Sequence, residues 1–172
     1  MYKGIFRERR STSVTLALAA ILAALVTVTT YMIQVPIPAT QGFFNVGDGM
    51  IMVAALTFGP VIGGIAGGLG SSLADLIGGW YVWVIPTLVI KGIEGLIAGW
   101  ISNKSKEQSF RTSILAWLIG GSEMVLGYFI IQVYLYGLQA ALVEVPFNLI
   151  QMTVGGIIGI PVSIIVRRYL AV

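Results

Sequence analysis

Long apolar runs are the feature of this sequence that most restricts its fold. They cover residues 13–33, 48–59, 60–79, 84–101, 113–136 and 141–166, and most approach the ~20 residues with which an α-helix crosses a bilayer. With 57% hydrophobic and 10% charged residues, too few polar side chains remain to cover a soluble domain. The sequence therefore predicts an all-α integral membrane protein, with residues 1–172 forming a single transmembrane domain.

The stretch 48–79 decides how many helices to expect. A single helix over this stretch would be longer than one membrane span, and its first part, 48–59, is too short to span alone. Gly59 and Pro60 interrupt the stretch, and proline removes a backbone donor within a helix but readily begins a new one. We therefore predict two short helices joined by a tight turn, and six transmembrane helices in total.

The basic residues predict the orientation. Since Lys and Arg accumulate in short cytoplasmic loops, a six-helix topology places every basic cluster on the cytoplasmic side, together with the N- and C-termini. This explains the excess of basic residues without a nucleic-acid partner. The first apolar run continues past signal-peptide length without a cleavage site, so we expect it to be retained as a helix. The clusters are Lys3, Arg7, Arg9 and Arg10; Lys104, Lys106 and Arg111; and Arg167 and Arg168.

Several function classes are excluded by what the sequence lacks. It has no Cys and no His, which removes thiol chemistry, Cys/His metal sites and histidine catalysis, and it has no phosphate-binding loop. We predict no enzyme activity, no catalytic residue, no metal and no cofactor. One alternative is an intramembrane aspartyl protease using Asp48 and Asp75, but its Gly-x-Gly-Asp motif would require glycine in place of Asn45. A self-sufficient permease or channel is the other alternative.

Ionisable residues within the apolar runs point to a binding site. Each costs at least ~2.5 kcal/mol at that depth, so they should face a cavity or one another. Lys91 and Glu94, three residues apart, could simply neutralise each other. The residues concerned are Asp75, Lys91, Glu94, Glu123 and Glu144.

Polar residues also recur at helical spacing in the last two helices. Because they occupy one half of each helix, they predict a small-molecule pocket; the alternative is hydrogen bonding that only holds the helices together. One face carries Tyr128, Gln132 and Tyr136, and the other Glu144, Asn148 and Gln151.

The segments between helices carry two further candidates. Residues 34–47 form a long external loop, either a lid over the pocket or a connector in which Asn45 or Asp48 caps the next helix. Trp80, Tyr81 and Trp83 are expected to form an interfacial aromatic belt, or else to stack on a ring-shaped ligand.

Small residues form smooth faces on two helices, and such faces allow close approach between helices. The glycines of 63–70 indicate packing within the bundle. The small face of the first helix indicates either such packing or a docking surface for a partner subunit; it consists of Ser13, Ala17, Ala20, Ala24 and Thr27.

Three blocks within residues 42–102 carry a family resemblance: GFFNVGDGMIMVAALTFGP, GGIAGGLGSSLADLIGG and PTLVIKGIEGLIAG, in that order and spacing. With them the chain resembles the S components of energy-coupling factor (ECF) transporters, in particular the riboflavin-transporter-like branch. The flanking parts, 1–41 and 103–172, match only in hydropathy, length and the Ala-rich first helix.

The resemblance implies a multi-pass protein of a prokaryotic cell membrane that captures a vitamin or vitamin precursor at the outer face. It also implies uptake of this ligand together with a membrane T component and two cytoplasmic ATPases. S components of this kind dock through an Ala-x-x-x-Ala pattern on the first helix. Ala20 and Ala24 match that pattern, on the same face as Ala17, and so do Ala19 and Ala23 on a neighbouring face.

The resemblance further implies a substrate site beneath the first external loop, between the last three helices. Because carboxylates outnumber Lys91 in this region, a substrate with its own carboxylate is disfavoured. A neutral or weakly basic heteroaromatic ring fits better, and riboflavin, hydroxymethylpyrimidine and pyridoxine all stay open. The candidate substrate-binding residues are Phe43, Asn45, Lys91, Glu94, Glu123, Tyr128, Gln132, Asn148 and Gln151.

Overall fold

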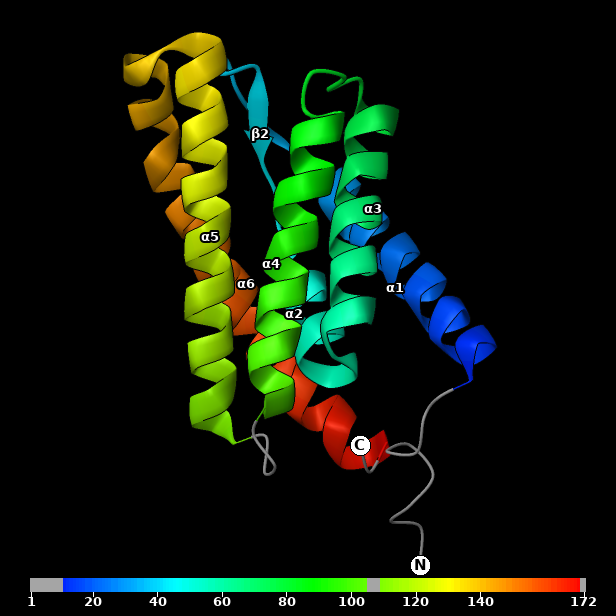
Figure 1. Cartoon of the computed structure of the whole chain (residues 1–172). Helices are drawn as coiled ribbons and strands as arrows, with labels where there is room; N and C mark the ends of the chain where they lie inside the picture. The colour runs from blue at the N-terminus through cyan, green and yellow to red at the C-terminus, as the bar shows by residue number, and fades with distance from the viewer. Residues whose placement is uncertain (1–10, 105–108, 171–172) are drawn as a thin grey trace, which may run out of the picture.

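The computed structural model describes residues 11–104 and 109–170, and within these ranges the chain forms six helices and one short hairpin (Figure 1). The all-α prediction with six helices is confirmed. Five helices are long and apolar enough to cross a membrane, whereas α2 has only eleven residues. The elements are α1 (Thr12–Met32), β1 (Val35–Ile37), β2 (Gly42–Phe44), α2 (Asp48–Phe58), α3 (Pro60–Gly78), α4 (Val84–Lys104), α5 (Phe110–Tyr136) and α6 (Leu138–Leu170).

The break between α2 and α3 lies where the sequence predicts it. Gly59 has a φ of +95° and Pro60 occupies the first turn of α3, so the chain reverses at a position that a side chain would strain. A Cβ atom at Gly59 would also lie 2.6 Å from Nδ2 of Asn103. The two helices are therefore separate elements rather than one long span.

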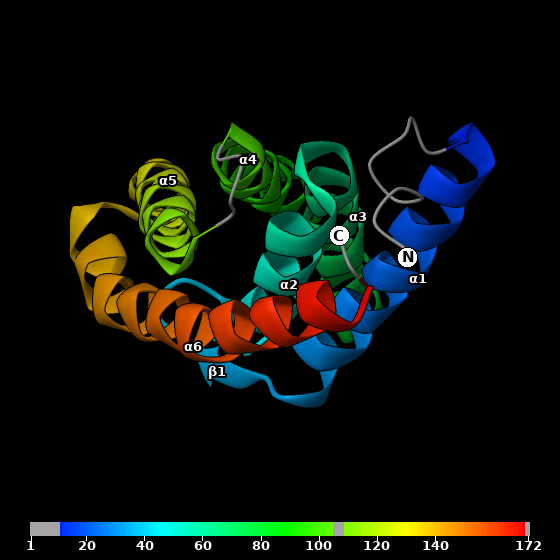
Figure 2. The same ribbon diagram turned by 90° about the horizontal axis from the view of Figure 1, so that it is seen from below.

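The short helix α2 forms the centre of the molecule. Figure 2 shows it lying between α6 and the pair formed by α3 and α4, all of which it contacts. Nine of its eleven residues are buried. On one side Ile51 and Ala54 pack against Val26 of α1, and on the other Met52 and Leu56 pack against the α4–α6 side of the bundle. A helix that is apolar on every face is suited to this position.

Glycines bring α3 and α4 into close contact. A Cβ atom at Gly63 would lie 2.8 Å from the carbonyl oxygen of Gly95, and one at Gly67 would lie 2.5 Å from that of Lys91. Side chains at these positions would therefore hold the two backbones apart. The prediction that the glycines serve packing within the bundle is confirmed.

The two alanine faces of α1 have different environments. Ala19 and Ala23 are buried, and the carbonyl oxygen of Ala23 lies 2.6 Å from where a Cβ atom of Gly70 in α3 would sit. Ala17, Ala20 and Ala24 are exposed. One small face of α1 thus serves packing within the bundle, and the other is open.

The two ends of the bundle differ. The first residues of α1, the last residues of α6 and the α2–α3 turn lie at one end, and the β1–β2 hairpin lies towards the other (Figure 1). The orientation of the termini relative to the membrane stays a prediction.

Candidate ligand-binding site

A buried group of three charges forms one side of the site. Nζ of Lys91 lies 2.5 Å from Oδ1 of Asp48 and 2.9 Å from Oε2 of Glu94, and all three side chains are at most 2% exposed. An unpaired charge would be costly here, so the pairing stabilises the arrangement. The sequence indicated the pair of Lys91 and Glu94, but not Asp48, which lies 43 residues away from Lys91 along the chain.

Asp48 also connects the segment before α2 to α6. Its Oδ1 accepts a hydrogen bond from Nε2 of Gln151 at 3.2 Å, and Oε1 of Gln151 accepts one from the backbone N–H of Asn45 at 3.0 Å. Oδ1 of Asn45 in turn accepts from the N–H of Gly47 at 2.9 Å. The end of the segment 34–47, expected as an external loop, is therefore buried inside the bundle, and α2 begins beside Lys91.

Aromatic side chains from three segments form another part of the wall. Trp83, before α4, packs edge-on against Tyr128 of α5 with ring centroids 5.7 Å apart, and the hydroxyl of Tyr128 donates to Thr87 at 3.1 Å. Phe43 of β2 completes the group. Trp83 is only 3% exposed and its indole N–H donates to the carbonyl of Gln41 at 2.9 Å. The prediction of an interfacial belt is therefore wrong for Trp83.

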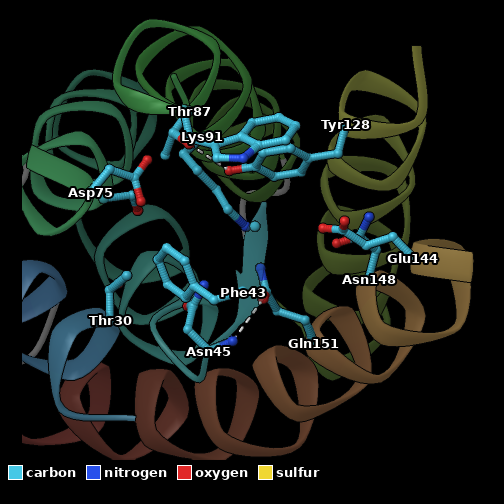
Figure 3. Close-up of a pocket in the computed structure, with 13 residues that line it drawn as sticks. Thr30, Phe43, Asn45, Asp75, Thr87, Lys91, Tyr128, Glu144, Asn148 and Gln151 are labelled. Carbon is cyan, nitrogen blue, oxygen red and sulfur yellow. Dashed lines mark hydrogen bonds between the residues drawn. The ribbon is translucent and has the colours of Figure 1, made fainter. Parts of the chain in front are cut away.

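Polar groups on α3 and α6 lie on opposite sides of the site. Asp75 of α3 is on one side and Glu144 and Asn148 of α6 are on the other, with Lys91 between them (Figure 3). Glu144 accepts a hydrogen bond from the hydroxyl of Thr40 in the hairpin. Nδ2 of Asn148 is buried and has no hydrogen-bond partner among the described residues.

Together these groups enclose a tight cavity. The part of it that water-sized spheres can reach measures about 20 Å³, which is room for about one water molecule. A ring compound would therefore have to move the walls apart, and the hairpin is one of these walls. The lining residues are Thr30, Gly42, Phe43, Asn45, Ser71, Asp75, Trp83, Thr87, Lys91, Tyr128, Glu144, Asn148 and Gln151.

Six of the nine candidate residues from the sequence line this cavity, and three do not. Glu94 supports Lys91 from outside the lining. Gln132 is fully buried, and its amide has no hydrogen-bond partner among the described residues. Glu123 is partly exposed. The six are Phe43, Asn45, Lys91, Tyr128, Asn148 and Gln151.

Seven lining residues were not among the candidates. Their depth in apolar helices marks Asp75 and Glu144 as unusual in the sequence, and stacking on a ligand is one of the two roles that the sequence leaves open for Trp83. The three hydroxyl residues carry no sequence signal, because single hydroxyls are common in membrane helices. The seven are Thr30, Gly42, Ser71, Asp75, Trp83, Thr87 and Glu144.

A helical membrane bundle around a narrow cavity lined by aromatic, amide and carboxylate groups defines a membrane-embedded binding protein. A sequence model described as "ECF-type riboflavin transporter, S component" matches residues 10–168. The chain belongs to this family of S components. It is thus a multi-pass membrane protein of transport, not an enzyme, as predicted.

Individual relatives agree with the family. The chain is 46% identical over 143 residues to an uncharacterised protein of Pyrococcus woesei, covering 83% of this chain and 95% of the relative. It is 31% identical over 154 residues to the thiamine precursor transporter HmpT of Lactococcus lactis, covering 89% and 87%. The fold matches that of the S component of a bacterial ECF transporter with a TM-score of 0.64 at 23% identity, covering 94% and 97%.

Proposed function

We propose that this chain captures a one-ring heteroaromatic vitamin precursor of the hydroxymethylpyrimidine type and delivers it for uptake with a T component and two ATPases. The observation that carries the proposal is the cavity itself, in which Phe43, Trp83 and Tyr128 surround buried hydrogen-bonding groups. Aromatic walls suit a flat ring, and the polar groups suit the heteroatoms at its edge.

The tightness of the cavity favours a small ring. Since water-sized spheres reach only about 20 Å³ of it, every added ring requires a larger displacement of packed walls. A single ring therefore demands less rearrangement than the fused rings of riboflavin. The similarity to the thiamine precursor transporter HmpT supports the same choice.

The charges of the lining disfavour an anionic substrate. Lys91 is already paired with Asp48 and Glu94, whereas Asp75 and Glu144 add further carboxylates to the wall. A carboxylate on the substrate would meet these groups without a free cation to balance it. A neutral or weakly basic ring with N–H groups suits them.

Titration calorimetry of the purified protein with hydroxymethylpyrimidine, pyridoxine and riboflavin tests the substrate. We expect the strongest binding for hydroxymethylpyrimidine. Tighter binding of riboflavin, or no binding of any of the three, would contradict the proposed substrate. Uptake by vesicles that contain this chain alone would favour a self-sufficient permease.

The exposed small face of α1 is proposed as the docking surface for the T component. Ala20 and Ala24 lie on this face with Ala17, while the competing pair Ala19 and Ala23 is buried against the bundle. Ala20→Trp and Ala24→Trp should therefore prevent co-purification of the T component and ATPases while ligand binding persists.

The matched control for the docking surface is Leu25→Trp, on another exposed face of α1, where a large side chain is already present. This variant should retain the complex. Co-purification of the complete complex with both alanine variants would show that docking uses another surface.

A further inference from the structure

Asp75 is a buried carboxylate that the fold itself does not explain. It lies in the last turn of α3, is 2% exposed and lines the cavity. Its Oδ2 has no hydrogen-bond partner among the described residues. Buried polar groups normally have partners, and charges within a membrane are rare without a function.

The position of Asp75 on its helix is electrostatically unfavourable. The carboxyl end of a helix carries partial negative charge, so a carboxylate in the last turn is repelled. The turn after α3 is closed by the backbone carbonyl of Asp75, which accepts from the N–H of Trp80 at 2.8 Å. Since any residue supplies that carbonyl, helix termination does not require an aspartate.

Neighbouring groups compensate the negative charge of Asp75 only in part. Lys91 interacts with it electrostatically, but this ammonium group donates its observed hydrogen bonds to Asp48 and Glu94. Thr87 interacts with Asp75, and its oxygen accepts from Tyr128. Asp75 thus has one weak hydroxyl partner and no cation of its own.

The surroundings of Asp75 form a corner of the cavity rich in oxygen atoms. Ser71 lies one turn before it on α3, and Thr30 of α1 also lines the cavity. Oγ1 of Thr30 is buried and has no hydrogen-bond partner in the described part of the chain. Figure 3 shows Thr30 and Asp75 on the side of the cavity opposite Glu144 and Asn148.

Glu144, the other carboxylate of the lining, is already engaged. It accepts from the hydroxyl of Thr40, so it holds the hairpin to α6. On the same helix, Nδ2 of Asn148 is a donor without a partner. The cavity therefore offers a free acceptor at Asp75 and a free donor at Asn148 on opposite sides.

We propose that Asp75 determines specificity by accepting hydrogen bonds from an amino group or protonated ring nitrogen of the substrate, while Asn148 donates to an acceptor at the opposite edge. The inference rests on the proposed function, because it describes how the ring is oriented in that cavity. The expected substrates are heteroaromatic rings with an amino group, which should bind more tightly than the same rings with an oxo or hydroxyl group.

Two matched ligand pairs test this inference by titration calorimetry. They are hydroxymethylpyrimidine with its 4-amino group against the 4-oxo analogue, and pyridoxamine against pyridoxine. In the unchanged protein the amino member of the pyrimidine pair should bind about ten- to a hundredfold more tightly, the scale of an unmet buried hydrogen bond. In Asp75→Asn this preference should fall below about threefold, because an amide presents both a donor and an acceptor.

The matched control is Glu144→Gln, the same chemical change on the opposite wall. It should weaken both members of a pair alike and leave their ratio unchanged, with thermal unfolding confirming that both variants fold. A ratio that Asp75→Asn leaves unchanged, or that Glu144→Gln abolishes, overturns the inference while the proposed function stands. Failure of the unchanged protein to bind any of the four compounds overturns both.

Discussion

Asp48 and Asp75 are both buried aspartates in apolar helices, and their surroundings are opposite. Asp48 lies in the first turn of α2, where the helix dipole favours a negative charge, and it is bonded to Lys91 and Gln151. Asp75 lies in the last turn of α3, where the dipole disfavours it, and it interacts with Thr87 but forms no ion pair within 4 Å among the described residues. Oδ2 lacks a hydrogen-bond partner in both aspartates.

The comparison separates a carboxylate that stabilises the fold from one that is available to a ligand. Both side chains are at most 2% exposed, so burial alone does not distinguish them. They differ in that Oδ1 of Asp48 accepts hydrogen bonds from Lys91 and Gln151, and in the end of the helix on which each residue lies. Substitutions around Asp48 should therefore act mainly on stability, and those at Asp75 mainly on binding.

The largest effect is expected from removing the cation that Asp48 shares with Glu94. Lys91→Met would leave two carboxylates together in the interior, and breaking such a pair costs about 3–5 kcal/mol. We expect a loss of this size in the free energy of unfolding, measured by denaturant titration in detergent micelles.

Two variants control the experiment on Lys91. Lys104→Met changes a lysine of the same helix that is exposed and lies 3.4 Å from the ring centroid of Trp100, and it should cost less than about 1 kcal/mol. Combining Lys91→Met with Asp48→Asn and Glu94→Gln should restore most of the stability. If Lys91→Met is no more harmful than Lys104→Met, the structural role assigned to Asp48 is wrong.

An intermediate effect is expected from Gln151→Ala, which removes the connection between Asp48 and the backbone of Asn45. The buried N–H of Asn45 would lose its acceptor, which costs about 1–3 kcal/mol. Asn148→Ala, on the same helix, removes an amide whose nitrogen has no partner among the described residues.

The two amide variants should differ in thermal stability and in ligand affinity when both are measured. Gln151→Ala should lower the thermal stability of the free protein, whereas Asn148→Ala should leave it nearly unchanged and weaken ligand binding by about five- to a hundredfold. The same stability loss in both variants, with equal affinities, would remove the distinction between the two sides of the site.

The smallest effect on stability is expected at Asp75 itself. Because Asp75→Asn removes a negative charge from the carboxyl end of α3, the free energy of unfolding should stay constant or rise by up to about 1 kcal/mol. Unfolding without ligand provides the measurement, and Asp48→Asn provides the matched comparison, with a clear loss expected there. A loss at Asp75 as large as that at Asp48 would mean that Asp75 is structural as well.

Local signals made much of the fold predictable. The six helices follow from apolar runs, and the break at Gly59 and Pro60 follows from backbone chemistry that needs no tertiary information. In the same way, the pairing of Lys91 with Glu94 was foreseeable because residues three apart share a helix face.

The remaining features depend on how distant segments meet. Neither hydropathy nor length shows that the segment before α2 enters the bundle. The contact between Asp48 and Lys91 could therefore not be predicted from the sequence. The sequence located Trp83 near a helix end but not its inward direction. It also gave two equivalent alanine pairs on α1, which only the packing of Ala23 against Gly70 distinguishes.

The brevity of α2 has a consequence for permeability. The helix begins beside the charged group of the site and continues for eleven residues, about 16 Å at 1.5 Å per residue, towards the α2–α3 turn at the opposite end. Nine of those residues are buried, so the path below the cavity is filled by tightly packed hydrocarbon. A solute in the cavity is thus separated from the far side by an apolar layer about half as thick as a bilayer core. In this conformation the subunit should not conduct ions, and a bound ligand should leave the cavity through the side by which it entered.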